Sequence, residues 1–560
     1  MATLSKRIDS LDALIRAHAG KLEKSVYGVV DKINDDGTPH FVRKWKGTIG
    51  NMEETDDKPT IFVIEKLEPL ILKHKKWKLI YGGRAGTKSI MVMDTMSGDV
   101  NSCGSKVFVL RERMKSLRES IFAGIEARIK ALKFKGFLPV PSQWEIRCKN
   151  GGKLSFGGMQ NIIDMKGSFE YKYFLMEEAA RTKQNTLDTL GPTLRGVDGA
   201  EIWAVWNPES AVDPMSTEFI IPYQADLDKT GYYEDDYHMV IKVGFEDNPW
   251  FMHDQSLREE YEKDLQKKND GRMSEARFNH IWHGMFNDDI DNSVIKADWF
   301  DACIDAHKKL GFDATGAIVA GFDPSDVGND AKGYAKRHGV VFDDIRELEA
   351  DNANRGFDIA CRDAKLSGCD SFGWDADGMG ALLRDQAARN FKDTKVNTYM
   401  YKGSESPHNP EALFKSAGDY GIRDGKKNKD VFDNKKAQNI IALAERVYKT
   451  FEAVKHGKYH NPEELISFDS SKISPAMMQK LRSECTRVPL KPSDKIKFYT
   501  KAEMRAGIPI YSKDGTRDKI VIPSPNLFDA VVLSFDNSAN ITKSRVNTAH
   551  RPQPIRPMGR

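Results

Sequence analysis

Short apolar runs that alternate with amphipathic stretches organise the first half of this chain. Between residues 61 and 208 the apolar runs predict strands, and helical patterns separate them, including the pattern at 116–133. Strands that alternate with helices favour a mostly parallel α/β sheet. The predicted strands are 77–83, 106–112, 172–179 and 201–208.

A second strand-rich unit is expected from residue 316 onward, after an acidic stretch at 286–293 that is typical of a connector. A long amphipathic pattern at 435–457 and an apolar segment at 526–535 predict helices in this unit. Its predicted strands lie in the runs 316–326, 333–348 and 369–380.

The two ends of the chain differ from this pattern. Residues 1–60 are polar, with an amphipathic helix expected near residues 10–22, and no acidic residue follows Asp536. We therefore predict five parts: an N-terminal polar and helical extension at 1–60, α/β domains at 61–290 and 313–536, a linker at 291–312, and a basic flexible tail at 537–560.

The composition limits the class of protein but does not decide its function. The 560 residues exceed the roughly 250–300 that one core supports, so two domains are expected. The 85 basic and 82 acidic side chains nearly cancel, so any basic surface must be local. Six scattered cysteines without a C-x-x-C pair argue against a disulfide framework or a zinc ribbon. With no apolar run near the ~18 residues of a membrane span, we expect a soluble, intracellular protein.

The stretch YGGRAGTKS at 81–89 is one residue away from the phosphate-binding pattern G-x-x-x-x-G-K-[ST]. It follows a predicted strand and precedes a predicted helix, as that chemistry requires. Lys88 would reach the β- and γ-phosphates of a nucleotide, and the Ser89 hydroxyl would ligate Mg²⁺. A glycine-rich turn without a ligand is the simpler alternative.

Thr87 stands where the pattern has its second glycine. The substitution is tolerable if this position needs only a negative φ, as the first step into a helix should. Gly82, Gly83 and Gly86 remain for positions with a positive φ or a close backbone approach.

Two glutamates end the predicted strand at 172–179. In a Walker B arrangement Glu177 would serve the metal, and Glu178 would orient and deprotonate the attacking water. Three arginines are candidates for stabilising charge on the γ-phosphate, although a surface salt bridge is an equal alternative for Arg181. These are Arg84, Arg181 and Arg195.

A second carboxylate cluster is predicted in the C-terminal unit. Asp323 and Asp375 end apolar runs, and Asp529 lies in the predicted helix at 526–535. Oxygen ligands suit Mg²⁺ or Mn²⁺, and two such ions support phosphodiester cleavage. An acidic residue at a strand end is more often only a cap. Secondary candidates are Asp326, Asp330 and Asp377.

These motifs, in this order along residues 60–535, resemble the large terminase subunit of tailed bacteriophages. The segments that carry the resemblance are 81–89, 109–122, 154–179, 203–210, 244–251, 278–286, 321–330, 374–380 and 526–532. The resemblance implies a P-loop NTPase domain with a mostly parallel sheet, followed by an RNase H-like α/β nuclease domain.

The resemblance also implies roles for individual residues. Asn207 would sense the γ-phosphate, and Asn526 stands where many relatives carry an acid or a histidine. A fourth metal ligand therefore stays open among Asp326, Asp330, Asp377 and Asn526. ATP binding falls on Gly82, Gly83, Arg84, Gly86, Thr87, Lys88, Ser89, Glu177 and Asn207, ATP hydrolysis on Arg84 and Glu178, and the metals on Ser89, Glu177, Asp323, Asp375 and Asp529.

The activity implied is ATP-driven packaging of double-stranded phage DNA, with Mg²⁺ at the motor site and two Mg²⁺ or Mn²⁺ at a nuclease that cuts concatemers. Expected partners are the portal protein of the procapsid, the small terminase subunit and further copies of the chain in a ring, for which a pentamer is expected. No membrane is expected, and the place of action is the host cytoplasm, transiently on the procapsid and not in the mature virion.

DNA contacts should dominate through phosphates, so DNA binding should weaken steeply with salt. The basic runs 70–78 and 424–430 are candidates for such contacts, with a solvated face as the alternative. The rival function is an ATP-dependent helicase or remodeller with an inactive RNase H-like binding domain. A portal-docking protein with a degenerate ATP site is a further rival.

Overall fold

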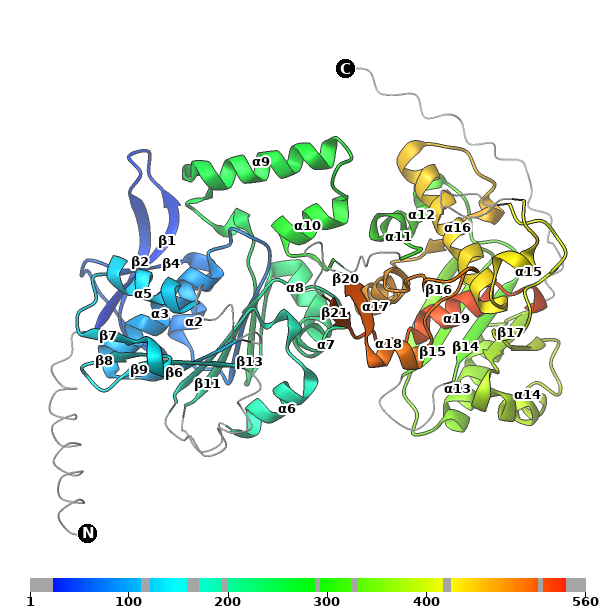
Figure 1. Ribbon diagram of the computed structural model, residues 1–560, viewed down its shortest axis with the longest axis horizontal. Helices are drawn as coiled ribbons and strands as arrows, with labels where there is room; N and C mark the ends of the chain where they lie inside the picture. The colour runs from blue at the N-terminus through cyan, green and yellow to red at the C-terminus, as the bar shows by residue number, and fades with distance from the viewer. Residues whose placement is uncertain are drawn as a thin grey trace, which may run out of the picture. The chain divides into compact units, whose positions relative to one another are not determined.

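The computed structural model divides the chain into two compact units, Met1–Asn287 and Asp288–Arg560. Each unit contains a twisted sheet with helices on its faces (Figure 1). No helix among the described residues is both long and apolar enough to cross a bilayer. The structure describes residues 24–111, 121–158, 171–193, 199–287, 293–324, 331–415, 425–511 and 517–539.

A nine-stranded sheet forms the centre of the first unit, in the order β12-β13-β5-β11-β10-β6-β9-β8-β7. The six strands from β13 to β9 pair in parallel, and the strands outside them are antiparallel. All four predicted strands are confirmed. The bounds are β5 (Trp77–Tyr81), β6 (Lys106–Arg111), β7 (Phe137–Val140), β8 (Glu145–Cys148), β9 (Lys153–Gly158), β10 (Tyr173–Glu177), β11 (Glu201–Trp206), β12 (Tyr232–Glu234) and β13 (His238–Lys242).

Helices cover both faces of this sheet, because its central strands are apolar on both sides and need two cores. On one face α3 contributes Met96 and Val100 to the core, and α5 contributes Ile125. The helix predicted at 116–133 corresponds to α5 over its described part. The helices are α2 (Pro69–Leu72), α3 (Lys88–Cys103), α5 (Ala123–Ala131), α6 (Gln184–Thr193), α7 (Pro214–Phe219), α8 (Gln224–Thr230), α9 (Gln255–Asn269) and α10 (Glu275–His283).

The N-terminal extension differs from the prediction over its described part. Instead of a polar, helical segment, residues 25–64 form a four-stranded sheet in the order β3-β2-β1-β4. The sequence of β2 hid this sheet, because most of its positions are only half-buried and Arg43, Lys44 and Lys46 interrupt the apolar residues. The helix predicted at 10–22 lies outside the described residues. The strands are β1 (Ser25–Ile33), β2 (Pro39–Thr48), β3 (Asn51–Glu54) and β4 (Ile61–Ile64).

The second unit contains a six-stranded mixed sheet, in the order β18-β17-β14-β15-β16-β19. The predicted strands and both predicted helices are confirmed. The strands are β14 (Ile318–Asp323), β15 (Lys332–His338), β16 (Val341–Leu348), β17 (Ser371–Asp375), β18 (Asn397–Tyr401) and β19 (Ser467–Phe468), with a separate hairpin of β20 (Ile508–Tyr511) and β21 (Arg517–Ile520). The helices are α13 (Ala353–Leu366), α14 (Arg384–Asn390), α15 (Asn428–Val431), α16 (Lys435–His456), α17 (Pro475–Thr486), α18 (Lys501–Ala506) and α19 (Asn526–Ser534).

Two glycines let α19 lie directly on this sheet. A Cβ on Gly333 would lie 2.2 Å from the Asn526 carbonyl oxygen, and a Cβ on Gly321 would lie 2.3 Å from that of Ala530. Any larger side chain would lift the helix away from β14 and β15. The close packing determines where Asp529, in the first turn of α19, lies relative to the strand ends.

The predicted linker at 291–312 is wrong for most of its length. It contains α11 (Ala297–Cys303) and α12 (Ala306–Leu310), and the Phe300 and Cys303 side chains are fully buried in the core of the second unit. Polar residues separate the apolar ones in this segment, so the sequence did not reveal that it contributes to the core. Residues 288–292 lie outside the described residues.

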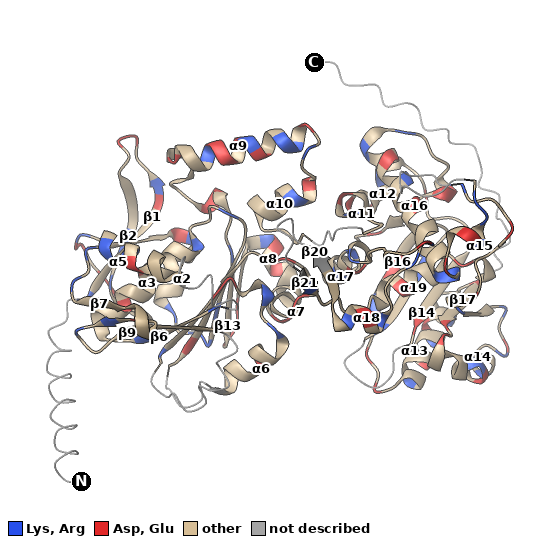
Figure 2. Ribbon diagram, viewed as in Figure 1, with Lys and Arg blue, Asp and Glu red and all other residues tan. Residues whose placement is uncertain are grey.

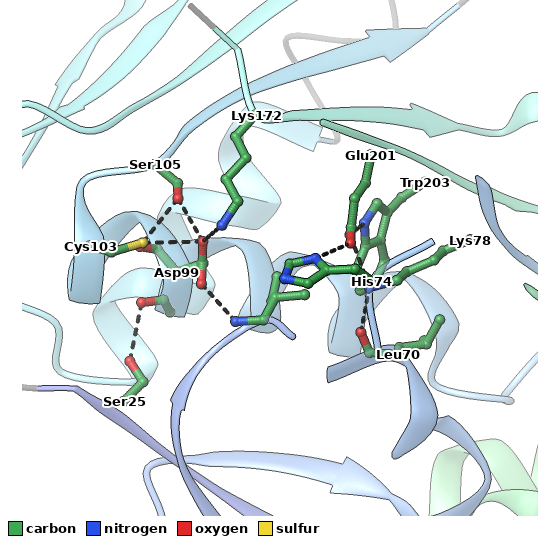
Figure 3. Close-up of polar contacts among 12 residues, drawn as sticks. Ser25, Leu70, His74, Lys78, Asp99, Cys103, Ser105, Lys172, Glu201 and Trp203 are labelled. Atoms are coloured by element: carbon green, nitrogen blue, oxygen red, sulfur yellow. Dashed lines mark hydrogen bonds and ion pairs between the residues drawn. The ribbon is translucent and has the colours of Figure 1, made fainter. Parts of the chain in front are cut away.

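A buried ion pair joins the starts of β5 and β11 (Figure 3). The Lys78 ammonium, with no exposed surface, lies 2.9 Å from a Glu201 carboxylate oxygen and donates to the Leu70 carbonyl. Burial lowers the pKa of Lys78 to about 8, and Glu201 opposes that shift. His74 and the Trp203 indole N–H also contact this carboxylate, so Glu201 has three partners.

We predict that Lys78→Met lowers the free energy of unfolding by roughly 3–5 kcal/mol, because Glu201 would keep a buried charge without its main counterion. Denaturant unfolding of the full chain, followed by circular dichroism, measures the change. The control is Lys130→Met, which breaks an exposed pair with Glu126 and should cost under ~0.5 kcal/mol. Equal losses for the two variants would contradict a special role for the buried pair.

We also predict that a fragment of residues 288–560 folds cooperatively, whereas a fragment of residues 311–560 does not. The shorter fragment lacks Phe300, and removing one buried Phe side chain costs about 3–5 kcal/mol. Near-ultraviolet circular dichroism and thermal melting of the two fragments measure this. A sharp, equal transition in both would show that 297–310 adds nothing to the core.

Candidate nucleotide and nuclease sites

A pocket of about 690 Å³ lies where the parallel strands of the first unit end. Four strand ends supply most of its side chains: β5, β11, β10 and β6 are neighbours in the sheet and point the same way. The residues that line it are Gly83, Arg84, Lys88, Ser89, Arg111, Glu177, Glu178, Ala180, Arg181, Val205, Trp206, Asn207, Glu209 and His280.

The loop at 81–89 packs closely against backbone from later in the chain. A Cβ on Gly82, whose φ is +145°, would lie 1.9 Å from the Val243 carbonyl oxygen. A Cβ on Gly83 would lie 2.1 Å from the Trp282 carbonyl oxygen. The prediction that these glycines serve close backbone approaches is therefore confirmed, whereas Gly86 has no such severe contact.

The interpretation of Thr87 is wrong. Its φ is +58°, in the left-handed region, so the position does not have the negative φ that we expected. The residue is the N-cap of α3 and its hydroxyl donates to the Gly86 carbonyl at 2.7 Å. The left-handed backbone explains why the standard pattern has a glycine here, and Thr87 carries the strain of that conformation.

Lys88 bends back over the loop that precedes it. Its ammonium donates to the carbonyl oxygens of Gly82, at 2.9 Å, and of Gly83. Burial lowers the pKa of Lys88 to about 8, while Glu177 raises it. The cation is therefore held inside the loop that would surround a nucleotide's phosphates.

Ser89 and Glu177 lie together, as a metal site would require. The Ser89 hydroxyl donates to one Glu177 carboxylate oxygen at 3.1 Å, and the other oxygen is buried without a hydrogen bond among the described residues. Burial raises the pKa of Glu177, and Arg111, 3.9 Å away, opposes that shift. An orphaned buried oxygen beside a hydroxyl fits a divalent cation with oxygen ligands.

Glu178 has an unusual backbone and a partner that was not among the predicted site residues. Its φ is +53°, and Arg111 Nε donates to its carboxylate at 2.9 Å. Strain of this kind is common at functional sites. Arg111 ends β6, the neighbour of β10, so only the strand order could reveal this pair.

Three of the remaining predicted residues of this site have protein partners. The Asn207 amide donates to the His280 carbonyl at 3.2 Å, and its own oxygen is buried without a hydrogen bond among the described residues. Arg84 pairs with Glu260 of α9 at 2.7 Å. Arg181 forms the surface pair with Glu209 that was its alternative, and Arg195 lies outside the described residues.

In the second unit, the three predicted aspartates come together. Asp323 and Asp375 end β14 and β17, which are parallel neighbours, and Asp529 lies in the first turn of α19. Burial, and then the Asp323 charge, raises the pKa of Asp375 to about 7. Burial also raises the pKa of Asp323, against the effect of Lys501. Such mutual repulsion requires positive charge nearby.

Two lysines supply that charge, and neither was among the residues predicted from the sequence. Lys501 of α18 lies 2.6 Å from an Asp323 oxygen and 3.1 Å from an Asp529 oxygen. Lys436 of α16 lies 2.8 Å from Asp529, and both lysines hold the pKa of Asp529 below its usual value although burial raises it. No three acidic, histidine or cysteine side chains of the described residues form a ready-made metal site.

The fourth-ligand candidates differ in their surroundings. Asn526 accepts from Lys501 at 2.9 Å and donates to the Ala331 carbonyl at 2.7 Å, so its amide faces the carboxylates. Asp377 is exposed and accepts from the backbone and hydroxyl of Ser404. Asp326 and Asp330 lie outside the described residues.

The two basic runs give little support to a DNA contact. Within 70–78, Lys73 and Lys75 pair with Glu234, and Lys78 pairs with Glu201. Within 424–430, Lys427 and Lys429 both pair with Glu411. Acidic and basic residues also alternate along α9 (Figure 2). The near-zero net charge thus reflects local neutralisation.

We predict that Thr87→Gly raises the free energy of unfolding by about 0.5–1 kcal/mol, since glycine adopts a positive φ without strain. Thr87→Val is the contrasting variant. It keeps the strain and loses the hydroxyl's hydrogen bond, so it should cost about 1 kcal/mol. Denaturant unfolding measures both, and a greater loss for Thr87→Gly than for Thr87→Val would contradict the left-handed backbone.

Comparisons with known proteins place this chain in a family. A family model described as phage terminase large subunit matches residues 74–280. The nuclease domain of the large terminase subunit gp2 of bacterial virus Sf6, in a structure with manganese and beta-thujaplicinol, is 40% identical, with 43% of this chain and 97% of that chain covered and a TM-score of 0.39. Another structure of that domain is 42% identical, with 43% of this chain and 97% of that chain covered and a TM-score of 0.38.

A more distant match covers more of the chain. The large terminase of a thermophilic bacteriophage is 11% identical, with 82% of this chain and 93% of that chain covered and a TM-score of 0.30. A search of curated proteins found no match. The family model over residues 74–280 and the 40% identity to a large terminase nuclease domain point to the same family. This chain belongs to the family of phage large terminase subunits, the DNA-packaging terminases.

Proposed function

We propose that this chain hydrolyses ATP to move double-stranded DNA into a procapsid, and cuts concatemeric DNA to start and end packaging. Family membership supports the general role. The observation that carries the motor half is the convergence of Lys88, Ser89, Glu177 and Glu178 on one pocket. The nuclease half rests on Asp323 and Asp375, at the ends of adjacent strands, together with Asp529 in the first turn of α19.

At the motor site each residue has a distinct role. Lys88 would exchange the loop carbonyls for the β- and γ-phosphates of ATP, and Ser89 with Glu177 would hold Mg²⁺. Bound there, Mg²⁺ would offset charge on the phosphate oxygens. Glu178, released from Arg111, would orient the attacking water and accept its proton. Arg84 and Asn207 would contact the γ-phosphate.

At the nuclease site Asp323, Asp375 and Asp529 would hold two Mg²⁺ or Mn²⁺. The donors are the hard oxygens that these ions prefer, and the ammonium groups of Lys436 and Lys501 already lie where positive charge is required. Two bound ions would stabilise the attacking and leaving oxygens of the phosphodiester. On metal binding, Lys436 and Lys501 would have to leave the carboxylates, and they could then pair with DNA phosphates.

The partners follow from the family. We propose that several copies form a ring, as a pentamer, on the portal protein of the procapsid, and that the small terminase subunit selects the DNA. The chain would act in the host cytoplasm, transiently on the procapsid and not in the mature virion.

One observation favours the alternative, a helicase or remodeller whose second domain binds nucleic acid without cutting. Lys501 bridges Asp323 and Asp529, and this arrangement alone would leave the carboxylates neutralised without metal. The two functions make opposite predictions for cleavage by the purified chain, so the experiment that follows separates them.

We predict that Lys88→Ala and Glu178→Gln each reduce ATP hydrolysis by at least ~100-fold, because they remove phosphate binding and the general base. Cleavage of plasmid DNA in Mn²⁺ should persist in both. Asp375→Asn should instead reduce DNA cleavage and leave ATP hydrolysis intact. Released phosphate and gel electrophoresis measure the two activities on the full chain.

Two matched variants serve as controls. Asp377→Asn changes an exposed carboxylate two residues from Asp375, and should leave cleavage within about twofold if Asp377 is not a ligand. Arg181→Ala removes a surface pair at the edge of the pocket, and should leave ATP hydrolysis within about fivefold. A wild-type chain that hydrolyses ATP but never cuts DNA, in Mg²⁺ or Mn²⁺, would favour the helicase-like alternative.

A further inference from the structure

An exposed apolar ridge lies next to the nuclease carboxylates. The short 3-10 helix Gly378–Leu383 follows β17 and starts three residues after Asp375. Two large apolar side chains on it face solvent: Leu382 is 84% exposed and Met379 is 42% exposed. We define Met379 and Leu382 as the ridge.

The geometry of the helix explains why these two residues form one surface. A 3-10 helix has three residues per turn, so positions i and i+3 lie one above the other. Met379 and Leu382 have this spacing and are exposed, whereas Gly380 and Leu383 have it and are buried. One stripe of the helix therefore packs inward and the adjacent stripe presents two apolar side chains to solvent.

The 3-10 helix packs closely against the end of β17. A Cβ on Gly380 would lie 1.8 Å from the Asp375 carbonyl oxygen, so only glycine allows this approach. The Trp374 indole N–H donates to the Gly380 carbonyl at 2.8 Å. Asp377 at its N-cap accepts two hydrogen bonds from Ser404, which ties the helix to the segment after β18. The ridge thus has a defined place beside Asp375.

The charge beside the ridge indicates its partner. Arg384 follows the 3-10 helix directly, and Arg389 lies five residues further along α14. Both are exposed and form no ion pair with any residue that the structure describes. Most lysines of the two basic runs, by contrast, are paired with carboxylates. Free guanidinium groups next to a proposed phosphodiester site suit DNA phosphates.

We infer that Met379 and Leu382 contact duplex DNA from the groove side and insert between base pairs, while Arg384 contacts the phosphate backbone. Leu and Met are among the side chains that proteins use as wedges between base steps, which bends the duplex. A bend at this point would present the scissile phosphate to Asp375 and its neighbours. This inference rests on the proposed nuclease function and names how its substrate is held.

The test uses the full chain and a DNA duplex that carries 2-aminopurine, with EDTA present so that no metal-dependent cutting occurs. The fluorescence of 2-aminopurine rises when a base step is unstacked. Wild-type protein should raise it, and the double variant Met379→Ala/Leu382→Ala should not. We expect the double variant to bind the duplex about tenfold more weakly, with an unchanged dependence on salt.

Two single variants complete the design. Arg384→Gln should weaken binding and reduce the slope of log affinity against log salt by about one, because it removes one phosphate contact. The matched control is Leu366→Ala, an 80% exposed leucine at the end of α13, which should change neither fluorescence nor affinity.

The outcomes separate this inference from the proposed function. Equal fluorescence and affinity for wild-type and the double variant would overturn the ridge as a DNA contact, even if the chain cuts DNA, and would leave it as a surface for a protein partner. Loss of fluorescence in the double variant would support the ridge, even if the wild-type chain proved unable to cut DNA.

Discussion

Parallel pairing of β5, β11, β10 and β6 is the constraint on which the first unit depends. Parallel strands end at the same edge of a sheet, so residues far apart in sequence meet there without any further device. Ser89 follows β5 and Glu177 ends β10, and their side chains are 3.1 Å apart although 88 residues separate them. The pocket, its strained backbone and its buried charges all lie at that edge.

Charge neutralisation is the second organising feature. Buried carboxylates are costly without partners, and several here have a cation from another element. Glu201 has Lys78, Asp323 has Lys501, and Asp529 has Lys436. At the proposed nuclease site two of these cations also lie where a charged substrate or a metal ion would bind. The groups that stabilise the fold are therefore the ones that would rearrange when a ligand binds.

Close backbone approach decides the geometry of the second unit. Gly321 and Gly333 let α19 rest on the sheet, and Gly380 lets the turn after β17 rest on Asp375. These contacts place an aspartate from a helix beside aspartates from two strands, and they hold the ridge of Met379 and Leu382 next to them. Small residues therefore determine the geometry of the proposed nuclease site as much as its acidic residues do.

The sequence by itself determined the four central strands β5, β6, β10 and β11 of the first sheet, the order of the two α/β units and the candidate loop and carboxylates, because hydrophobic periodicity and strand-end acids are local signals. Tertiary structure alone decided the rest. Thr87 has a left-handed backbone where the loop enters α3, and its own residue type does not signal this, because threonine rarely adopts a positive φ. The half-buried sheet at 25–64 and the helices at 297–310 take their stability from packing against distant core residues. Lys501 reaches Asp323 across 178 residues, a contact that exists only once α18 and β14 have folded together.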